Sequence, residues 1–235
     1  MEFSLDTNRS FLYGDGFFDT LLLVDGICQN YDLHYTRNIK SAKLLEIEWK
    51  SEWTIDFFKE ILTNIFKQYN KNLLKVRFTF FRSSNGGYCP ESNNMDFTIK
   101  TEIFVDSYPK IYNTGIFRKA TKQINFFSGI KSTSSLLYVM AALEMKKQNW
   151  DEIIILNENG RVCESLNSNI YLKKNNIFYT PPLSEGCVDG TFRMQMLRGN
   201  FDFKTFEKPI ELNELYEGRI YFSNAVKGLT EGKLI

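Results

Sequence analysis

Ser128-Gly129-Ile130-Lys131 opens the most informative part of this chain, which closes at Val188-Asp189-Gly190-Thr191-Phe192-Arg193. Val162-Cys163-Glu164 and Tyr179-Thr180-Pro181-Pro182-Leu183 lie between these two ends. The pattern predicts a lysine in a loop before an apolar helix, a carboxylate at the end of a short strand, and a glycine that opens another helix. An amine that can attack a carbonyl carbon, a carboxylate and the N–H groups of a helix start are typical of a catalytic ligand-binding site.

The segments around this lysine predict short strands and helices. A helix is expected over 134–147, because apolar residues recur there on successive turns. Short strands are expected over 152–156, 161–164, 169–172 and 177–179, and a final strand over 219–223. Asn159-Gly160 and Asn175-Asn176 are typical of the hairpin turns between such strands.

The N-terminal half predicts a sheet with two long helices. Strands are expected over 17–24, 27–31, 73–81 and 97–105. Asp32 is expected to cap a helix over 33–45, and Thr54 to cap a second helix. The pattern breaks at Tyr108-Pro109, so we expect an α+β protein with an N-terminal α/β domain over 1–107 and a C-terminal domain over 108–235.

Length, composition and charge exclude several classes of protein. The 235 residues, 43% of them apolar and 24% charged, are enough for a large hydrophobic core. A net charge of +1 gives no reason to expect a nucleic acid as partner. No apolar run is as long as a membrane span, so no membrane partner is expected, and Met1-Glu2-Phe3-Ser4-Leu5-Asp6 lacks the pattern of a signal peptide.

The cysteines and the single histidine argue against a metal site. Cys28, Cys89, Cys163 and Cys187 are scattered, which indicates four reduced thiols in a cytoplasmic protein. His34 is the one histidine of the chain, so a site built from several histidines is nearly ruled out. We expect no metal.

Six motifs, in one order along the chain, resemble the class-IV pyridoxal-phosphate aminotransferase family. This family contains branched-chain aminotransferases, D-amino-acid aminotransferases and 4-amino-4-deoxychorismate lyases. Besides the segment from Ser128 to Arg193, the motifs include Tyr13-Gly14-Asp15-Gly16-Phe17-Phe18-Asp19-Thr20, His34-Tyr35-Thr36-Arg37 with Ser41-Ala42, and Phe222-Ser223-Asn224-Ala225. The resemblance implies a small α/β N-terminal domain, a C-terminal domain with a barrel-like sheet, pyridoxal 5'-phosphate between them, and a homodimer.

The resemblance implies that Lys131 carries the cofactor and that Glu164 pairs with its pyridine nitrogen. A lysine in a partly desolvated pocket can attack an aldehyde, and it can then move the proton at the substrate's Cα. A carboxylate beside the pyridine nitrogen keeps that nitrogen protonated, so the ring withdraws electrons from Cα. Without the motifs, a solvated lysine and a surface glutamate would be the ordinary interpretations.

Phosphate contacts are implied for Arg37, for Gly190-Thr191-Phe192 and for Asn224. A guanidinium suits a phosphate dianion, although a surface arginine on an amphipathic helix is the alternative for Arg37. Backbone N–H groups at a helix start also bind phosphate. Phe192 stands where the family commonly has threonine, so a hydroxyl contact is lost or passes to Thr191. Asn224 takes the place of a polar residue near the phosphate and the substrate carboxylate.

Phe18, Thr20 and Arg82 are the candidates for substrate contact. Phe18 and Thr20 match family positions on the substrate side, although core packing explains Phe18 equally well. Arg82 precedes a glycine-rich loop and is a candidate for binding a carboxylate, with a solvated loop arginine as the alternative. His34 is expected to be structural, and Asp15 is expected to brace its turn.

Two reactions compete for a small amino-acid-like substrate. A 4-amino-4-deoxychorismate lyase eliminates pyruvate and leaves 4-aminobenzoate for folate biosynthesis, whereas an aminotransferase passes the amino group to a 2-oxo acid. Ser128-Gly129-Ile130-Lys131 and Asn224-Ala225 favour the lyase, and the lack of an asparagine after Lys131 counts against it. A non-catalytic scaffold that binds the cofactor is a third hypothesis, motivated by the short N-terminus and by Phe192, while Lys131 and Glu164 argue against it.

Overall fold

The structure is a computed structural model, and it describes residue 5, residues 8–199 and residues 201–235. Most of the N-terminal segment on which the signal-peptide expectation rests, residues 1–4 and 6, lies outside the described residues. The chain divides into two compact units, Met1–Val105 with Ile130–Ser134, and Asp106–Gly129 with Ser135–Ile235. Each unit has its own sheet and its own hydrophobic core, and the predicted α+β class is confirmed.

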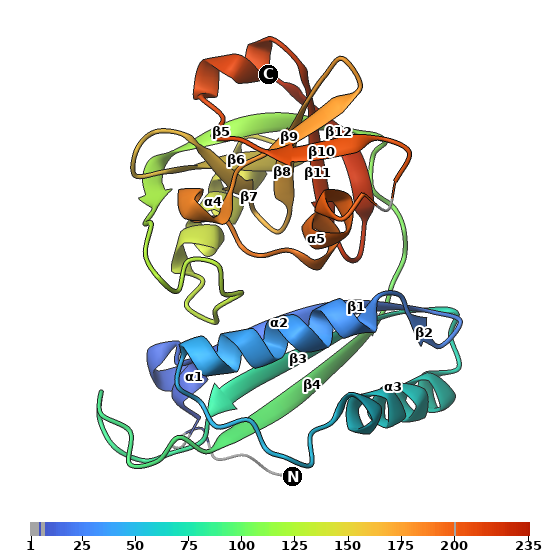
Figure 1. The fold of residues 1–235 in the computed structure, drawn as a ribbon, viewed down its shortest axis with the longest axis vertical. Helices are drawn as coiled ribbons and strands as arrows, with labels where there is room; N and C mark the ends of the chain where they lie inside the picture. The colour runs from blue at the N-terminus through green and yellow to red at the C-terminus, as the bar shows by residue number, and fades with distance from the viewer. Residues whose placement is uncertain (1–4, 6–7, 200) are drawn as a thin grey trace. The chain divides into compact units, whose positions relative to one another are not determined.

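The first unit is a four-stranded antiparallel sheet with two long helices beside it (Figure 1). The strands lie in the order β2-β1-β3-β4, with β1 (Gly16–Val24), β2 (Ile27–Cys28), β3 (Leu73–Arg82) and β4 (Met95–Ile103). The helices are the short α1 (Arg9–Tyr13) and the longer α2 (Tyr31–Leu44) and α3 (Ile55–Tyr69).

Alternation along β1 decides what each face of this sheet contacts, because successive side chains of a strand point to opposite faces. Phe17 and Leu21 are buried and pack in one cluster with Phe58 of α3. Burying one such side chain contributes on the order of 2 kcal/mol to stability. Phe18 and Thr20, between them, are half-buried on the opposite face. The sheet therefore has one face covered by helices and one face with accessible side chains.

Of the two N-caps that the sequence predicts for α2 and α3, the structure has only the one of α3. Thr54 caps α3 as predicted, since its Oγ1 accepts a hydrogen bond from Phe57 N at 3.2 Å. The prediction that Asp32 caps α2 is wrong, because the helix begins at Tyr31 after Asn30, whose φ is 54°. Asp32 lies in the first turn instead, where its charge meets the positive end of the helix dipole.

A short segment from the middle of the chain completes the first unit. Phe18 N donates to Lys131 O at 2.9 Å, and Thr133 N donates to Gly16 O at 3.0 Å. Ile130–Ser134 thus lies beside the start of β1 in antiparallel fashion, which fixes the backbone on both sides of the lysine. Nothing in the sequence pattern indicated this return of the chain.

The second unit is an eight-stranded sheet, which Figure 1 shows curled upon itself. Its strand order is β10-β9-β8-β11-β12-β5-β6-β7, and the three parallel pairs are β10 with β9, β12 with β5, and β5 with β6. The strands are β5 (Ile111–Lys122), β6 (Glu152–Asn157), β7 (Val162–Ser165), β8 (Asn169–Lys174), β9 (Ile177–Thr180), β10 (Lys204–Glu207), β11 (Arg219–Asn224) and β12 (Gly228–Leu234). The helices are α4 (Leu136–Lys147), η1 (Leu183–Glu185), α5 (Thr191–Leu197) and η2 (Leu212–Tyr216).

The strand β6 is covered on both faces and is buried at every position. Ile154 packs into the core inside the curled sheet with Phe222. Ile153 and Ile155 point the other way and pack against Ala141 of α4. A strand buried on both faces needs a continuous apolar run, and this explains why the sequence of β6 shows no alternation.

The prediction that 219–223 is the last strand is wrong, because β12 follows β11 and pairs with it along its length. Two glycines, Gly228 and Gly232, weaken the strand pattern of β12. Gly232 is required there, since a Cβ at this position would lie 2.4 Å from the Phe222 ring. Among the described helices, none combines the length and the hydrophobicity that a membrane crossing requires.

Candidate functional site

Lys131 lies over an aromatic ring on the accessible face of the first unit's sheet. It is half-buried, and its Nζ is 4.8 Å from the centroid of the Phe18 ring. The guanidinium of Arg77, from β3, lies 3.6 Å from the same centroid. Because a cation is attracted to the face of an aromatic ring, Phe18 holds both basic groups near one place.

Arg77 is a residue that the sequence interpretation missed. It lies directly opposite Thr20 in the pairing of β1 with β3, so Arg77, Thr20 and Phe18 share one face of the sheet. Burial lowers the pKa of Arg77 from its ordinary value, yet a guanidinium stays charged at any physiological pH. Arg77 alternates with Lys75 and Thr79 along β3, which is the ordinary pattern of a strand with one polar face, so no special signal marks it in the sequence.

Arg37, Asp19 and His34 form a buried polar cluster on the helix-covered face. The NH2 group of Arg37 donates to Asp19 Oδ1, and His34 Nδ1 lies 2.9 Å from the same oxygen. Burial alone would raise the pKa of Asp19, but Arg37 and then His34 lower it to about 2. Arg37 is 7% exposed, so the alternative of a surface arginine is wrong. A guanidinium held by a carboxylate has a fixed direction, which recognition of a phosphate needs.

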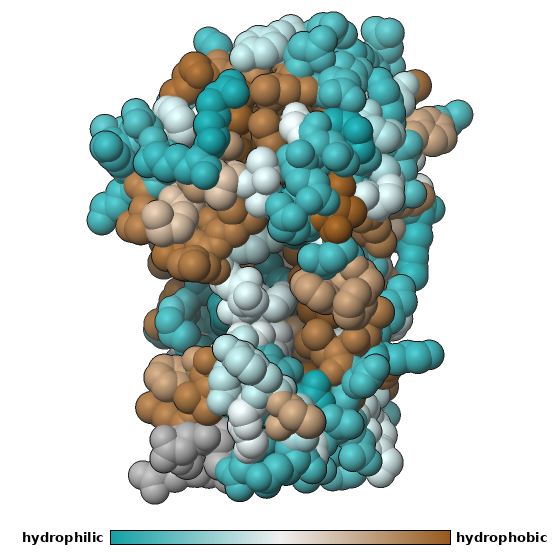
Figure 2. All heavy atoms as spheres, turned by 90° about the vertical axis from the view of Figure 1, so that its left-hand side faces the viewer, coloured by the Kyte–Doolittle hydropathy of each residue, from teal (hydrophilic) through white to brown (hydrophobic). Residues whose placement is uncertain are grey.

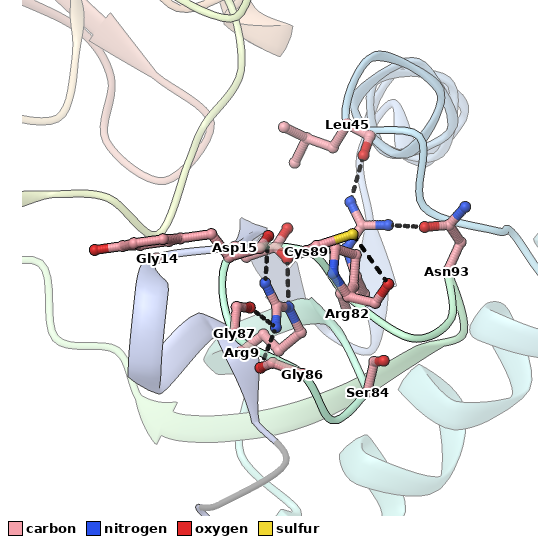
Figure 3. Close-up of polar contacts among 12 residues, drawn as sticks. Arg9, Gly14, Asp15, Leu45, Arg82, Ser84, Gly86, Gly87, Cys89 and Asn93 are labelled. Atoms are coloured by element: carbon pink, nitrogen blue, oxygen red, sulfur yellow. Dashed lines mark hydrogen bonds and ion pairs between the residues drawn. The ribbon is translucent and has the colours of Figure 1, made fainter.

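Arg82 is the centre of a buried clamp (Figure 3). Its Nε donates to Asp15 Oδ2 at 2.9 Å, and its NH2 donates to Leu45 O at 2.6 Å. Its NH1 donates to Glu46 O at 3.1 Å and to Asn93 Oδ1. The alternative of a solvated loop arginine is wrong. The role in substrate contact stays a prediction, which these contacts do not favour because they use most of the guanidinium's N–H groups.

Arg9 extends the same clamp to the glycine-rich loop (Figure 3). Its Nε donates to Asp15 Oδ2 at 2.9 Å, so this carboxylate oxygen accepts from two arginines. The NH1 of Arg9 donates to Gly86 O at 3.1 Å and Gly87 O at 2.7 Å, and its NH2 donates to Tyr88 O at 3.3 Å. Asp15 therefore braces more than its own turn, because it ties α1 and the start of β1 to the loop between β3 and β4.

Glu164 is held by three donors within the second unit. Tyr138 OH donates to Oε1 at 2.5 Å, Lys122 Nζ donates to the same oxygen, and Val188 N donates to Oε2 at 2.8 Å. Burial, and then the carboxylate, raise the pKa of Tyr138 well above its ordinary value, so the phenol keeps its proton and donates it. Glu164 is 3% exposed, and the alternative of a surface glutamate is wrong.

This carboxylate has one acceptor position left. An ionised carboxyl group offers about four lone-pair positions. The described residues fill both positions on Oε1 and one on Oε2. The remaining position on Oε2 suits an N–H donor such as a protonated ring nitrogen, because a desolvated carboxylate accepts strongly from a charged donor.

The backbone of Val188, which contacts Glu164, also fixes the start of α5. Asn169 Nδ2 donates to Val188 O at 2.8 Å, while the N–H of Val188 is held by Glu164. A Cβ on Gly190 would lie 1.9 Å from Asn169 Oδ1, so this position requires glycine. Gly190 is the N-cap of α5 and makes no side-chain cap bond. The structure thus brings two predicted sites, Glu164 and Gly190, together through Val188.

The remaining phosphate candidates of this unit differ in their surroundings. Phe192 packs into a hydrophobic cluster, with its ring centroid 5.5 Å from that of Phe201, so only its backbone is suited to a polar ligand. Thr191 is buried. Asn224 ends β11, where its Nδ2 donates to Ser168 Oγ at 3.1 Å and its Oδ1 accepts from backbone N–H groups of the following turn.

The thiols and acidic groups show no sign of a metal centre. Within the described ranges, no three His, Cys, Asp or Glu side chains are grouped so that they would bind a metal ion. The four cysteines are free thiols. Burial raises the pKa of Cys187 to about 12 and that of Cys163 well above its ordinary value, so both stay protonated.

The sequence of this chain matches a protein family and several known proteins. The family model described as "Amino-transferase class IV" matches residues 16–235. The D-alanine aminotransferase of Bacillus licheniformis is 23% identical over 198 residues, which cover 81% of this chain and 67% of that protein. The aminodeoxychorismate lyase of Bacillus subtilis (strain 168) is 28% identical over 194 residues, 79% of this chain and 64% of that protein.

The fold is also that of a solved structure. The crystal structure of the branched-chain aminotransferase from Thermoproteus uzoniensis matches with a TM-score of 0.88. The match covers 99% of this chain and 82% of that chain, at 20% identity. At such identity the likeness concerns the fold alone.

Proposed function

Since the chain belongs to the class IV aminotransferase family, whose members are enzymes that depend on pyridoxal phosphate, we propose that it binds this cofactor and is a 4-amino-4-deoxychorismate lyase. Such an enzyme removes pyruvate from its substrate and leaves 4-aminobenzoate. The observation that carries the cofactor proposal is Glu164, a buried carboxylate with one acceptor position left on Oε2. The lyase relative from Bacillus subtilis and the Ser128-Gly129-Ile130-Lys131 motif support the choice of reaction.

The residues of the chain fit the chemical groups of the cofactor. Lys131 supplies the amine for its aldehyde, Arg37 a cation for its phosphate, and Glu164 an acceptor for its ring nitrogen. We also propose the backbone of Gly190, Thr191 and Phe192 as phosphate ligands. When bound, the cofactor supplies an aldehyde for the substrate's amino group and an electron-withdrawing ring that stabilises negative charge at Cα.

Three residues of the first unit are proposed to act on the substrate. The amine of Lys131 takes the proton from Cα and returns a proton where the reaction needs one. Arg77 binds a carboxylate of the substrate, because its guanidinium is charged, stacked on Phe18 and fixed beside Thr20. Phe18 and Thr20 line this face. Arg82 is not among the proposed substrate ligands, because its N–H groups already donate to Asp15 and to acceptors of the neighbouring segments.

The second candidate function is an aminotransferase. It is supported by the likeness to the D-alanine aminotransferase of Bacillus licheniformis. Both reactions use Lys131 at Cα, and they differ in whether the carbon skeleton loses pyruvate or the amino group passes to a 2-oxo acid. Lys131, Arg77 and Glu164 suit both reactions, so the two candidates are distinguished by their products.

The test is a paired assay on the wild type and on Lys131→Ala. Borohydride treatment of the cofactor-loaded wild type should attach the cofactor to the peptide that contains Lys131. Lys131→Ala should lose this label and fall to background in both reactions, because the amine is gone. Lys110→Ala, at an exposed lysine, is the matched control and should behave as the wild type.

The products then separate the candidates. Pyruvate release from aminodeoxychorismate supports the lyase, and amine exchange with a 2-oxo acid without pyruvate release supports the aminotransferase. A protein that stays colourless after addition of the cofactor, or a label on another peptide, would contradict the proposal.

We further propose that the enzyme is a homodimer in the cytoplasm. The four free thiols support a reducing compartment. Four apolar side chains of α4 are exposed at helical spacing, Leu136, Val139, Met140 and Leu143. Figure 2 shows hydrophobic side chains at the surface of the second unit, and a stripe of this kind is typical of a contact with another subunit.

A further inference from the structure

Lys122 is a buried lysine that neither the sequence motifs nor the proposed reaction assigns. It is the last residue of β5 and is 8% exposed. The register of β5 on β6 shifts between Phe117 and Lys122, and the four residues before Lys122 are all exposed. Irregular pairing of this kind re-aims a side chain. Here it turns a lysine at the end of a strand into the interior of the unit.

The partner of Lys122 is the carboxylate of Glu164. Its Nζ donates to Oε1, and both side chains are at least nine-tenths buried. A buried lysine is rare and is tolerated only with a charged partner, because taking an ammonium group out of water is costly. A buried carboxylate has the same need. Each ion therefore stabilises the other, because either one alone would be a buried charge without a partner.

Three titratable groups near this pair stay uncharged. Tyr138 keeps its proton, and its ring centroid lies 5.5 Å from Lys122 Nζ. Burial raises the pKa of the Cys163 and Cys187 thiols, which also stay uncharged. The pair is buried, where the local dielectric constant is low, so the positive charge of Lys122 has a large influence on Glu164.

Lys122 and the open acceptor position lie on opposite oxygens of the carboxylate. Lys122 contacts Oε1, whereas the position left for another donor is on Oε2. A proton shared between Oε2 and a ring nitrogen is closer to Lys122 when it lies on the oxygen. Repulsion by the ammonium charge therefore drives this proton towards the nitrogen.

We propose that Lys122 is a positioning residue that keeps Glu164 ionised, occupies Oε1 with Tyr138, and so sets the protonation of the cofactor's ring nitrogen. This inference rests on the proposed function, because it requires a cofactor at Glu164. Lys122 has no contact with the substrate in this role. It acts through the carboxylate alone.

The experiment uses full-length protein loaded with pyridoxal phosphate that carries an isotope label at its ring nitrogen. Nuclear magnetic resonance of this nitrogen reports whether it is protonated. The wild type and Lys122→Arg, which keeps the positive charge, should show the protonated nitrogen. Lys122→Met and Lys122→Gln, which both lack the charge, should bind the cofactor and lose the protonated resonance. Lys122→Gln keeps a hydrogen-bond donor, so it separates charge from hydrogen bonding.

A second readout needs no cofactor. Infrared spectra of the cofactor-free Lys122→Met protein should show a new band of a protonated carboxylic acid, which disappears when Glu164→Gln is added. A merely structural lysine would change neither the nitrogen resonance nor this band. If one variant does not fold, the other neutral variant carries both measurements.

The outcomes separate this inference from the proposed function. Bound cofactor with a protonated nitrogen in a folded neutral variant would overturn the role of Lys122 and leave the proposed function standing. A wild type that binds no cofactor would overturn both.

Discussion

Asp19 is the buried carboxylate that pairs with Arg37 and His34 in the first unit. Its carboxylate lies between Arg37 and His34, and its Oδ2 is buried without a hydrogen-bond partner among the described residues. Removing one member of such a cluster leaves a buried charge uncompensated, which is more costly than losing an exposed ion pair.

Asp19→Asn should therefore destabilise the protein by about 3 kcal/mol at neutral pH. The folded pKa of Asp19 is about 2, below the value of about 3.9 for an unfolded chain, so its contribution is present above about pH 4 and is lost as the pH falls towards 2. Urea unfolding across this range should show the gap between the variant and the wild type closing on the acid side.

Asp56→Asn is the control, because the Asp56 side chain is 87% exposed. Its unfolding should stay close to that of the wild type at every pH. An Asp19→Asn protein as stable as the wild type at neutral pH would show that the cluster contributes nothing.

At the residue scale, a motif names individual candidates, whose roles stay predictions, but it does not show which residues they pair with. Lys131, Glu164 and Arg37 stand in recognisable contexts. Asp19 and Arg37 are 18 residues apart, and Lys122 and Glu164 are 42 residues apart. The first pair is set by the packing of α2 on β1 and the second follows the irregular pairing of β5 with β6, and no local spacing encodes either.

Among the elements, the long periodic ones were predictable. The strand over 17–24 and the helix after Thr54 are confirmed as β1 and α3. The first turn of α2 and the short α1 were not predictable, because single residues decide them: Asn30 in a left-handed conformation, and Asn8 as the cap of α1. Sequence periodicity therefore predicts the middle of a helix or strand better than the residue at which it begins.

The loop between β3 and β4 gives a prediction at this scale. Arg9→Ala removes three hydrogen bonds to backbone carbonyls of the loop and the ion pair with Asp15. Charge-assisted hydrogen bonds contribute about 1.5–3 kcal/mol each when one partner is ionised, so local opening should become at least about tenfold more frequent. Limited proteolysis beside Tyr88, which is 93% exposed, should speed up accordingly.

The control for the loop is Arg198→Ala, at an exposed arginine of the second unit. Its cleavage pattern should match that of the wild type. Equal cleavage rates for Arg9→Ala and the wild type would mean that the clamp does not hold the loop.

For the whole molecule, the proposed homodimer is the property to test. Val139→Glu with Met140→Glu places two charges on the exposed stripe of α4, where desolvation of unpaired carboxylates would oppose association. Light scattering after size-exclusion chromatography should show a dimer for the wild type and a monomer for this variant.

Asn64→Glu with Gln68→Glu adds the same two charges to exposed positions of α3 and is the matched control. It should remain a dimer. A wild type that elutes as a monomer would contradict the proposed assembly, and a dimeric α4 variant would place the interface elsewhere.

The return of Ile130–Ser134 to β1 has a consequence for biosynthesis. A nascent chain leaves the ribosome from its N-terminus, so its first 105 residues emerge with one border of β1 still unoccupied near Gly16. That border is closed only after translation has passed residue 134, by which time β5 of the other unit has already been made. Synthesis of the second unit thus begins before the first can be finished, and a gene cut after Val105 would yield a fragment without the segment Ile130–Ser134.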